Sequence, residues 1–217
     1  MRRRLAILAL AALVPVAAAY AAPGDPKRKL NAVDNDLARG VLVRQSELPS
    51  GSWDAKPTDF SQANPPCVVA HFNLSALTVT GEAGTTYASR NGTNGGISYV
   101  ESDAHLFLTP AQASRAFAKI AVPGFATCVA SALVDSLRQA GYPAALVKAQ
   151  PIGMHAVRES VAAGFHVVLR IGNRTVDDTH LELLRSRELA TVDAFGVGSQ
   201  PIATSLAAKV ASRLTDG

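Results

Sequence analysis

The second half of the chain is a succession of strand candidates with no helical segment between them. Short β-rich runs lie at residues 145–148, 155–161, 165–171, 179–184 and 188–195, with turn candidates at Gly172-Asn173 and Ser186-Arg187. Strands joined by short turns pair antiparallel, because a parallel pair needs a crossover of a dozen or more residues. This succession therefore excludes a βαβ arrangement and predicts an antiparallel sheet.

Helical segments flank these strands. Apolar residues recur at helical spacing over residues 30–42, 109–121, 125–140 and 201–214. Residues 77–81, 85–90 and 98–108 are further strand candidates. Strands and paired helices in this order predict an α+β fold, and we expect a single domain over residues 31–217.

The N-terminus has the three parts of a secretory signal peptide. Arg2, Arg3 and Arg4 precede an apolar run over residues 5–16, and Ala19-Tyr20-Ala21 supplies the small residues of a cleavage site. We predict a signal peptide over residues 1–21, cleavage between Ala21 and Ala22, and a linker over residues 22–30. The mature protein is then secreted or cell-envelope and not stably inserted in a membrane, and a retained anchor is the alternative.

The positive charge of the chain belongs mostly to these N-terminal segments. The formal net charge is +4, but six of the 21 basic residues and one of the 17 acidic residues lie within residues 1–30. The remainder is close to neutral. A nucleic-acid partner needs a basic patch on the folded domain, so we expect none.

Cys67 and Cys128 are the only cysteines, and both lie in the exported part. An even count in an oxidising compartment predicts one disulfide between them. Two buried thiols are the alternative. A metal site is disfavoured because Cys67 and His71 lack the second ligand pair that structural zinc needs, so we expect no metal.

Two sets of ionisable residues recur at every second position of predicted strands. Alternation in residues 98–108 places Glu101, Asp103 and His105 on one face, and Asp178, His180 and Glu182 share a face in the same way. Such a face could hold an acid–base site or part of a metal site. The favoured interpretation is the solvent-exposed face of a half-buried sheet, which needs polar residues at alternate positions.

The sequence predicts a binding domain more readily than an enzyme. It contains no G-x-S-x-G, H-E-x-x-H, P-loop or dinucleotide motif, and we expect no cofactor. We predict a non-enzymatic domain for a small envelope molecule or another protein, with Trp53 as a ligand candidate that fits the core better. The alternatives are a secreted hydrolase that uses a carboxylate–histidine face, and an extracellular interaction or inhibitor protein.

A series of landmarks supports this prediction. They are the segment S-E-L-P-S-G-S-W at 46–53, Cys67, L-T-V-T-G at 77–81, the helix candidate from Thr109 and F-A-T-C at 125–128. Their order resembles secreted actinobacterial domains related to the PknH-like extracellular sensor domain of receptor serine/threonine kinases, over most of residues 40–215. The resemblance implies an α+β domain with a central antiparallel sheet, helices on one face and a cleft for an unknown ligand. It carries over no site residue.

Overall fold

A computed structural model describes residues 25–60, 73–94, 96–120, 122 and 124–216. The predicted signal peptide and its cleavage site lie outside the described residues, as does Cys67. No helix in the described part is long and apolar enough to cross a membrane.

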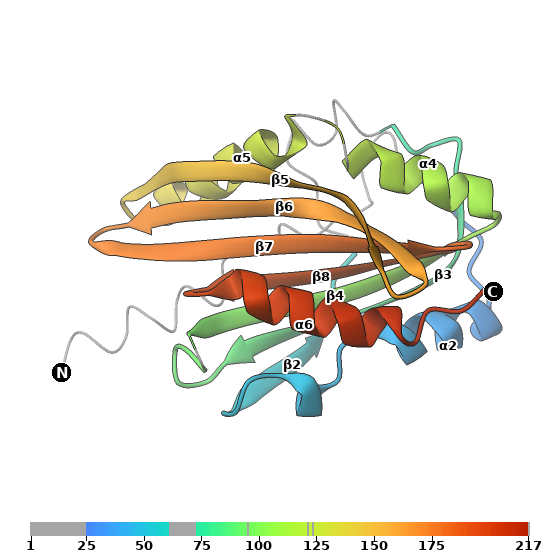
Figure 1. Cartoon of the computed structure of the whole chain (residues 1–217), viewed down its shortest axis with the longest axis horizontal. Coiled ribbons are helices and arrows are strands. Elements are labelled where there is room, and N and C mark those ends of the chain that lie inside the picture. The colour runs from blue at the N-terminus through green and yellow to red at the C-terminus, as the bar shows by residue number, and fades with distance from the viewer. Residues whose placement is uncertain (1–24, 61–72, 95, 121, 123, 217) are drawn as a thin grey trace.

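One eight-stranded sheet runs through the molecule in the order β1-β3-β4-β8-β7-β6-β5, with β2 paired to β3 as well (Figure 1). Only β1 runs parallel to its neighbour, so the sheet is mixed, while the pairs from β3 to β5 are antiparallel as predicted. The strands are β1 (Lys27–Arg28), β2 (Trp53–Pro57), β3 (Thr78–Ser89), β4 (Ile97–Phe107), β5 (Ala144–Val157), β6 (Ser160–Ile171), β7 (Arg174–Arg185) and β8 (Glu188–Gly196).

Most predicted elements are present, but several strands differ from the prediction. The predicted strands at 77–81 and 85–90 form one continuous strand, β3. The prediction of one strand over 155–161 is wrong, because a tight turn at Arg158 and Glu159 separates β5 from β6 there. Arg158 adopts a left-handed conformation at φ 54°. Lys27 and Arg28, from the predicted linker, pair with Thr78 and Val79 of β3.

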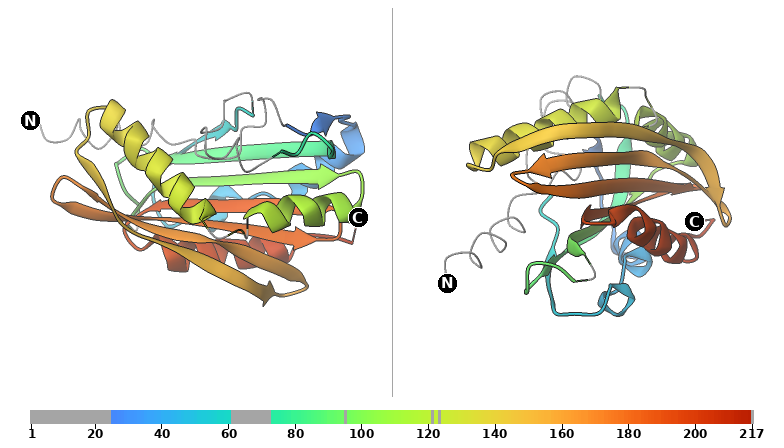
Figure 2. Two further views of the ribbon diagram at one scale, coloured as in Figure 1. Left: turned by 90° about the horizontal axis from the view of Figure 1, so that it is seen from above. Right: turned by 60° about the vertical axis from the view of Figure 1, so that its left-hand side comes forward.

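Helices cover both faces of the sheet, so the expectation of helices on one face is wrong. α2 (Ala32–Val41) and α6 (Ser199–Ala211) lie on one face, and α4 (Pro110–Ile120) and α5 (Phe125–Gln139) lie on the other (Figure 2). The reason is the apolar content of the central strands. β8 directs Val192 and Ala194 to one face and Leu189 and Phe195 to the other, and both sets are buried.

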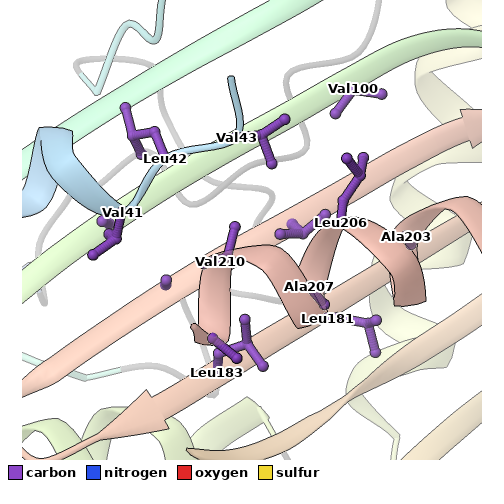
Figure 3. Packing of buried hydrophobic residues seen from close by; sticks show 14 of the residues in the cluster. Val41, Leu42, Val43, Val100, Leu181, Leu183, Ala203, Leu206, Ala207 and Val210 are labelled. Carbon is purple, nitrogen blue, oxygen red and sulfur yellow. The ribbon is translucent and has the colours of Figure 1, made fainter. Parts of the chain in front are cut away.

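The face under α2 and α6 is an apolar core. Leu206 and Val210 of α6 pack in one cluster with Leu181 and Leu183 of β7 (Figure 3). Trp53 belongs to the same cluster and donates a hydrogen bond from Nε1 to the carbonyl of Pro49 at 2.9 Å. The core alternative for Trp53 is therefore the one that the structure supports.

An ion pair fixes α2 against the turn between β7 and β8. Arg187 donates to both carboxylate oxygens of Asp34, at 2.6 and 2.9 Å, and Asn31 caps the helix by accepting from the Asp34 backbone. The Arg187 guanidinium holds the pKa of Asp34 well below its usual range. This contact joins the N-terminal part of the chain to the C-terminal strands.

Candidate functional site: a buried polar layer

The sheet register joins the two sets of ionisable residues predicted from the sequence. β8 lies between β4 and β7, and Asp193 of β8 is directly opposite Glu101 on one side and His180 on the other. Thr191 is opposite Asp103 and Glu182 in the next row. Since residues in direct register share a face, the two sets form one group across three strands. We call this group the polar layer: Tyr99, Glu101, Asp103, His105, Asp178, His180, Glu182, Thr191 and Asp193.

The polar layer is not exposed to solvent, which corrects the interpretation of these residues as the wet face of the sheet. Glu101 and Asp103 are each 1% exposed, Asp178 is 2% exposed and Glu182 is 4% exposed. The physical reason is that α4 and α5 cover this face (Figure 2). Alternation within a strand predicts which residues share a face, but a second layer of helices decides whether that face meets water.

Apolar clusters flank the polar layer on two sides. Toward α5 lies a cluster that contains Tyr99, Phe165 and Phe195, and toward α4 lies one that contains Ala163 and Leu189. The ring of Phe165 stacks on the imidazole of His180, with centroids 4.7 Å apart and planes 6° from parallel. The polar layer is therefore surrounded by apolar groups that strengthen the electrostatic interactions within it.

His180 is the centre of the β7 side of the layer. Its Nδ1 lies 3.1 Å from Asp193 Oδ2, and its Nε2 lies 3.3 Å from Glu182 Oε1. Burial by itself would lower the pKa of His180, but the hydrogen bonds to Asp193 and Glu182 outweigh burial and raise it to about 10. At neutral pH, His180 is therefore an imidazolium held between two carboxylates.

The β4 side of the layer holds two neighbouring carboxyl groups. Glu101 Oε2 accepts a hydrogen bond from Tyr99 OH at 2.6 Å, and Asp103 Oδ1 accepts one from Thr58 Oγ1 at 2.8 Å. Burial raises the pKa of Asp103 to about 7. Burial and the nearby charge of Asp103 raise the pKa of Glu101 well above its usual value, so the neutral form of Glu101 is favoured relative to an exposed carboxyl group.

Asp178 extends the layer toward α5. Burial, followed by the neighbouring charge of Asp193, raises the pKa of Asp178 well above its usual value. Its Oδ1 atom is buried and has no hydrogen-bond partner, and the same is true of Glu182 Oε2. A buried polar atom without a partner costs about 1–3 kcal/mol. The layer thus contains two acceptor positions that its own residues leave unsatisfied.

The segment after β2 covers the other end of the layer. The Phe60 ring lies 5.3 Å from the His105 ring in an edge-on arrangement, and Arg28 of β1 donates to the Phe60 carbonyl at 3.3 Å. Arg28 also lies 3.2 Å from Glu82. Burial lowers the pKa of His105 to about 4, so this imidazole is neutral at neutral pH.

Gly84 of β3 leaves room for the Asp103 carboxylate. A Cβ atom on Gly84 would lie 2.1 Å from Asp103 Oδ1 and 2.6 Å from Thr58 Oγ1. The hydrogen bond between Thr58 and Asp103 therefore depends on the missing side chain at position 84.

Sequence reasoning identified six residues of the layer and missed Tyr99, Thr191 and Asp193, as well as Thr58, which donates to Asp103 from outside the layer. Asp193 carried a usable signal, because it is the one charged side chain in the otherwise apolar and small run 189–196. Tyr99 was placed on the correct face, but nothing in the sequence marks it as the donor to Glu101. Thr58 lies in a polar loop where the sequence offers no distinguishing pattern.

The described residues contain no group of three or more His, Cys, Asp or Glu side chains that could hold a metal ion. Cys128 lies on α5, and its predicted partner Cys67 lies outside the described residues, so the disulfide stays a prediction.

No protein-family model matches the chain. No curated protein matches it either. Solved structures that are similar to it include two mycobacterial proteins. One is the extracellular domain of PknH from Mycobacterium tuberculosis, with a TM-score of 0.46, 11% identity, and 84% of this chain and 97% of that chain covered. The other is an uncharacterized protein from Mycobacterium smegmatis, with a TM-score of 0.46, 12% identity, and 83% of this chain and 97% of that chain covered. The first of these structures is an extracellular domain of the kind that the sequence landmarks resemble.

Proposed function

We propose that this chain is a non-enzymatic, exported binding domain and that the polar layer is its ligand site. The observation that carries the proposal is the pair of buried acceptors, Asp178 Oδ1 and Glu182 Oε2, that lack hydrogen-bond partners. A fold gains no stability from burying such atoms unsatisfied. A ligand that supplies hydrogen-bond donors would remove this cost.

The state of His180 favours binding over hydrolysis. A general base needs a ring nitrogen that can reach the substrate or a water molecule. Both ring nitrogens of His180 lie against carboxylates, and its raised pKa keeps the ring protonated at neutral pH. The carboxylate–histidine arrangement therefore acts as a fixed ion-pair network, which suits recognition.

The buried position of the layer also disfavours the alternative of a protein that acts only through a surface patch. Its charged groups are buried on the sheet face that α4 and α5 cover, and Asp103 lies behind Thr58, so a flat protein surface cannot reach them. Small envelope molecules remain the partner class that we propose.

We further propose that the chain is exported by residues 1–21 and that Cys67 and Cys128 form a disulfide. The charged, apolar and small-residue segments of the N-terminus support export. The two cysteines, both beyond the leader, support one bridge in an oxidising compartment.

Native mass spectrometry of the protein purified from its own host tests the binding function. We expect a noncovalent adduct of a small molecule on the wild type that is released on denaturation. The Glu182→Gln variant keeps the size of the side chain but changes the unpartnered acceptor, so it should lose the adduct. Glu159→Gln is the matched control, because Glu159 lies on the β5–β6 turn with its side chain 73% exposed.

A wild-type protein that carries no adduct would contradict the proposal. An adduct of undiminished occupancy in Glu182→Gln would contradict the assignment of the site. Conversion of the retained molecule into a product on incubation would contradict the non-enzymatic part.

A further inference from the structure

We infer that the ligand of the polar layer is an organic cation with at least two nitrogen centres, of the polyamine or guanidinium class, and that it enters in exchange for protons. This inference rests on the proposed function and names its ligand class. It follows from the charge balance of the layer, the positions of the two unsatisfied acceptors and the protonation of the carboxyl groups.

Each of the three strands that form the layer contributes acidic side chains to it. β4 contributes Glu101 and Asp103, β7 contributes Asp178 and Glu182, and β8 contributes Asp193. The cations are His180, which is already shared between two carboxylates, and Arg28 at the far end, which pairs with Glu82. In the described part of the chain, no Lys or Arg side chain makes an ion pair with these five carboxyl groups.

The helices above the layer add no compensating charge. The residues of α5 that pack against this face are apolar, such as Val129 and Leu133, and so are Ala116 and Phe117 of α4. These described helices therefore supply no second cationic partner to the layer. A ligand that brings positive charge and N–H donors together supplies both missing properties.

The two unsatisfied acceptors are separated along β7. Asp178 and Glu182 lie four residues apart on the same strand face, with His180 between them, which corresponds to about 13 Å between their Cα atoms. A compact metal ion cannot meet both positions at its short bonding distances. A flexible chain that carries amine groups at intervals can place one nitrogen beside each carboxyl group.

Protons balance the charge when no cation is present. Burial raises the pKa of Glu101 and that of Asp178 well above their usual values, which favours the protonated form of both groups, and it raises the pKa of Asp103 to about 7, so Asp103 holds a proton at mildly acidic pH. An ammonium group that arrives beside such a carboxyl group stabilises the carboxylate, and the displaced proton passes to solvent. Each carboxyl group that becomes ionised in this way releases one proton, and binding therefore strengthens as pH rises.

Thr58 and Phe60 cover the β4 end of the layer, where they contact Asp103 and His105. Both residues are partly exposed and follow β2, which pairs with β3 near the edge of the sheet. The Thr58 hydroxyl donates to Asp103 Oδ1 at 2.8 Å and lies 3.5 Å from Glu101 Oε1.

Isothermal titration calorimetry with spermidine tests this inference on the full mature protein. At pH 6.0, titrations in two buffers with different ionisation enthalpies count the protons released. We expect saturable binding, release of at least one proton per spermidine, and no binding of the neutral analogue 1,8-octanediol. Affinity should increase between pH 6.0 and pH 7.5.

Variants locate the binding. Glu182→Gln and Asp178→Asn should each weaken spermidine binding at least tenfold, while Glu159→Gln should leave it unchanged. Thermal melts of each variant check that the fold is retained. Two separate variants are used because, if one of them misfolds, the other still tests whether the layer binds spermidine.

The outcomes separate the ligand class from the binding function. A retained host ligand that is neutral or anionic, with no spermidine binding, overturns the cation inference and leaves the binding function standing. Spermidine binding without proton release also overturns it. So does an affinity for spermidine in both Glu182→Gln and Asp178→Asn that equals that of the wild type. If the protein carries no host ligand and binds no spermidine, the inference and the proposed function both fail.

Discussion

Asp103 shows how a single residue links the polar layer to pH. Its carboxyl group is 1% exposed, and burial raises its pKa to about 7 from an ordinary value of 3.8. Between these two values the unfolded chain has released the proton while the folded chain still holds it. The folded state then binds more protons, so its stability falls as pH rises through this window.

This residue gives a measurable prediction for stability. From pH 4 to pH 7, Asp103 should lower the free energy of unfolding by an amount on the order of a few kcal/mol, since one pKa unit corresponds to about 1.4 kcal/mol. Asp103→Asn removes the titrating group while its amide oxygen can still accept from Thr58. Urea unfolding at a series of pH values should therefore show that the free energy of unfolding declines less steeply with rising pH in the variant than in the wild type. At pH 8 the variant should be the more stable of the two.

A matched control separates this effect from surface charge. Asp135→Asn on α5 removes a carboxyl group whose side chain is 67% exposed, and it should leave the pH slope as in the wild type. A slope in Asp103→Asn equal to that of the wild type would show that Asp103 does not hold its proton in the folded state.

At the scale of elements, the contact between β6 and β7 depends on close approach of two backbones. A Cβ atom on Gly164 of β6 would lie 2.0 Å from the backbone carbonyl oxygen of His180. A backbone atom in a paired strand cannot move aside as a flexible side chain can. The position of His180 in the polar layer thus depends on a glycine in the neighbouring strand.

Gly164→Ala should therefore destabilise the protein by about 1–3 kcal/mol, the usual cost of overpacking a buried site. Gly153→Ala on β5 is the control, because a Cβ atom there would meet no heavy atom within 4 Å, and its effect should stay within about 0.5 kcal/mol. Urea unfolding of both variants measures the difference. Equal stability of the two variants would contradict the close backbone contact.

The elements also show which parts of the structure the sequence can predict. Alternation correctly placed Glu101, Asp103 and His105 on the face opposite Val100, because a strand has a strict period of two. The same pattern could not predict that β8 lies between β4 and β7, since strand order is a property of the whole sheet. Asp193 joins the two predicted sets only because of that order.

At the scale of the whole molecule, the helices determine the character of the site. α2 and α6 enclose an apolar core on one face, whereas α4 and α5 enclose a face that carries most of the buried charge. The exposure of one sheet face was predicted wrongly because each strand was considered without the helix layer that covers it. The same layer excludes water from the carboxyl groups of the polar face and so strengthens the electrostatic interactions among them.

The proposed disulfide between Cys67 and Cys128 would act at this scale, because Cys128 lies on α5, one of the two helices that cover the polar layer. The bridge closes a loop of about 60 residues, and the loop-entropy relation gives it roughly 4 kcal/mol of stabilisation. Reduction should therefore lower the free energy of unfolding by about that amount, measured by urea unfolding with and without reductant. The double variant Cys67→Ser with Cys128→Ser should unfold identically under both conditions. Titration of free thiols in denatured, non-reduced protein should detect none, and two reactive thiols per chain would contradict the bridge.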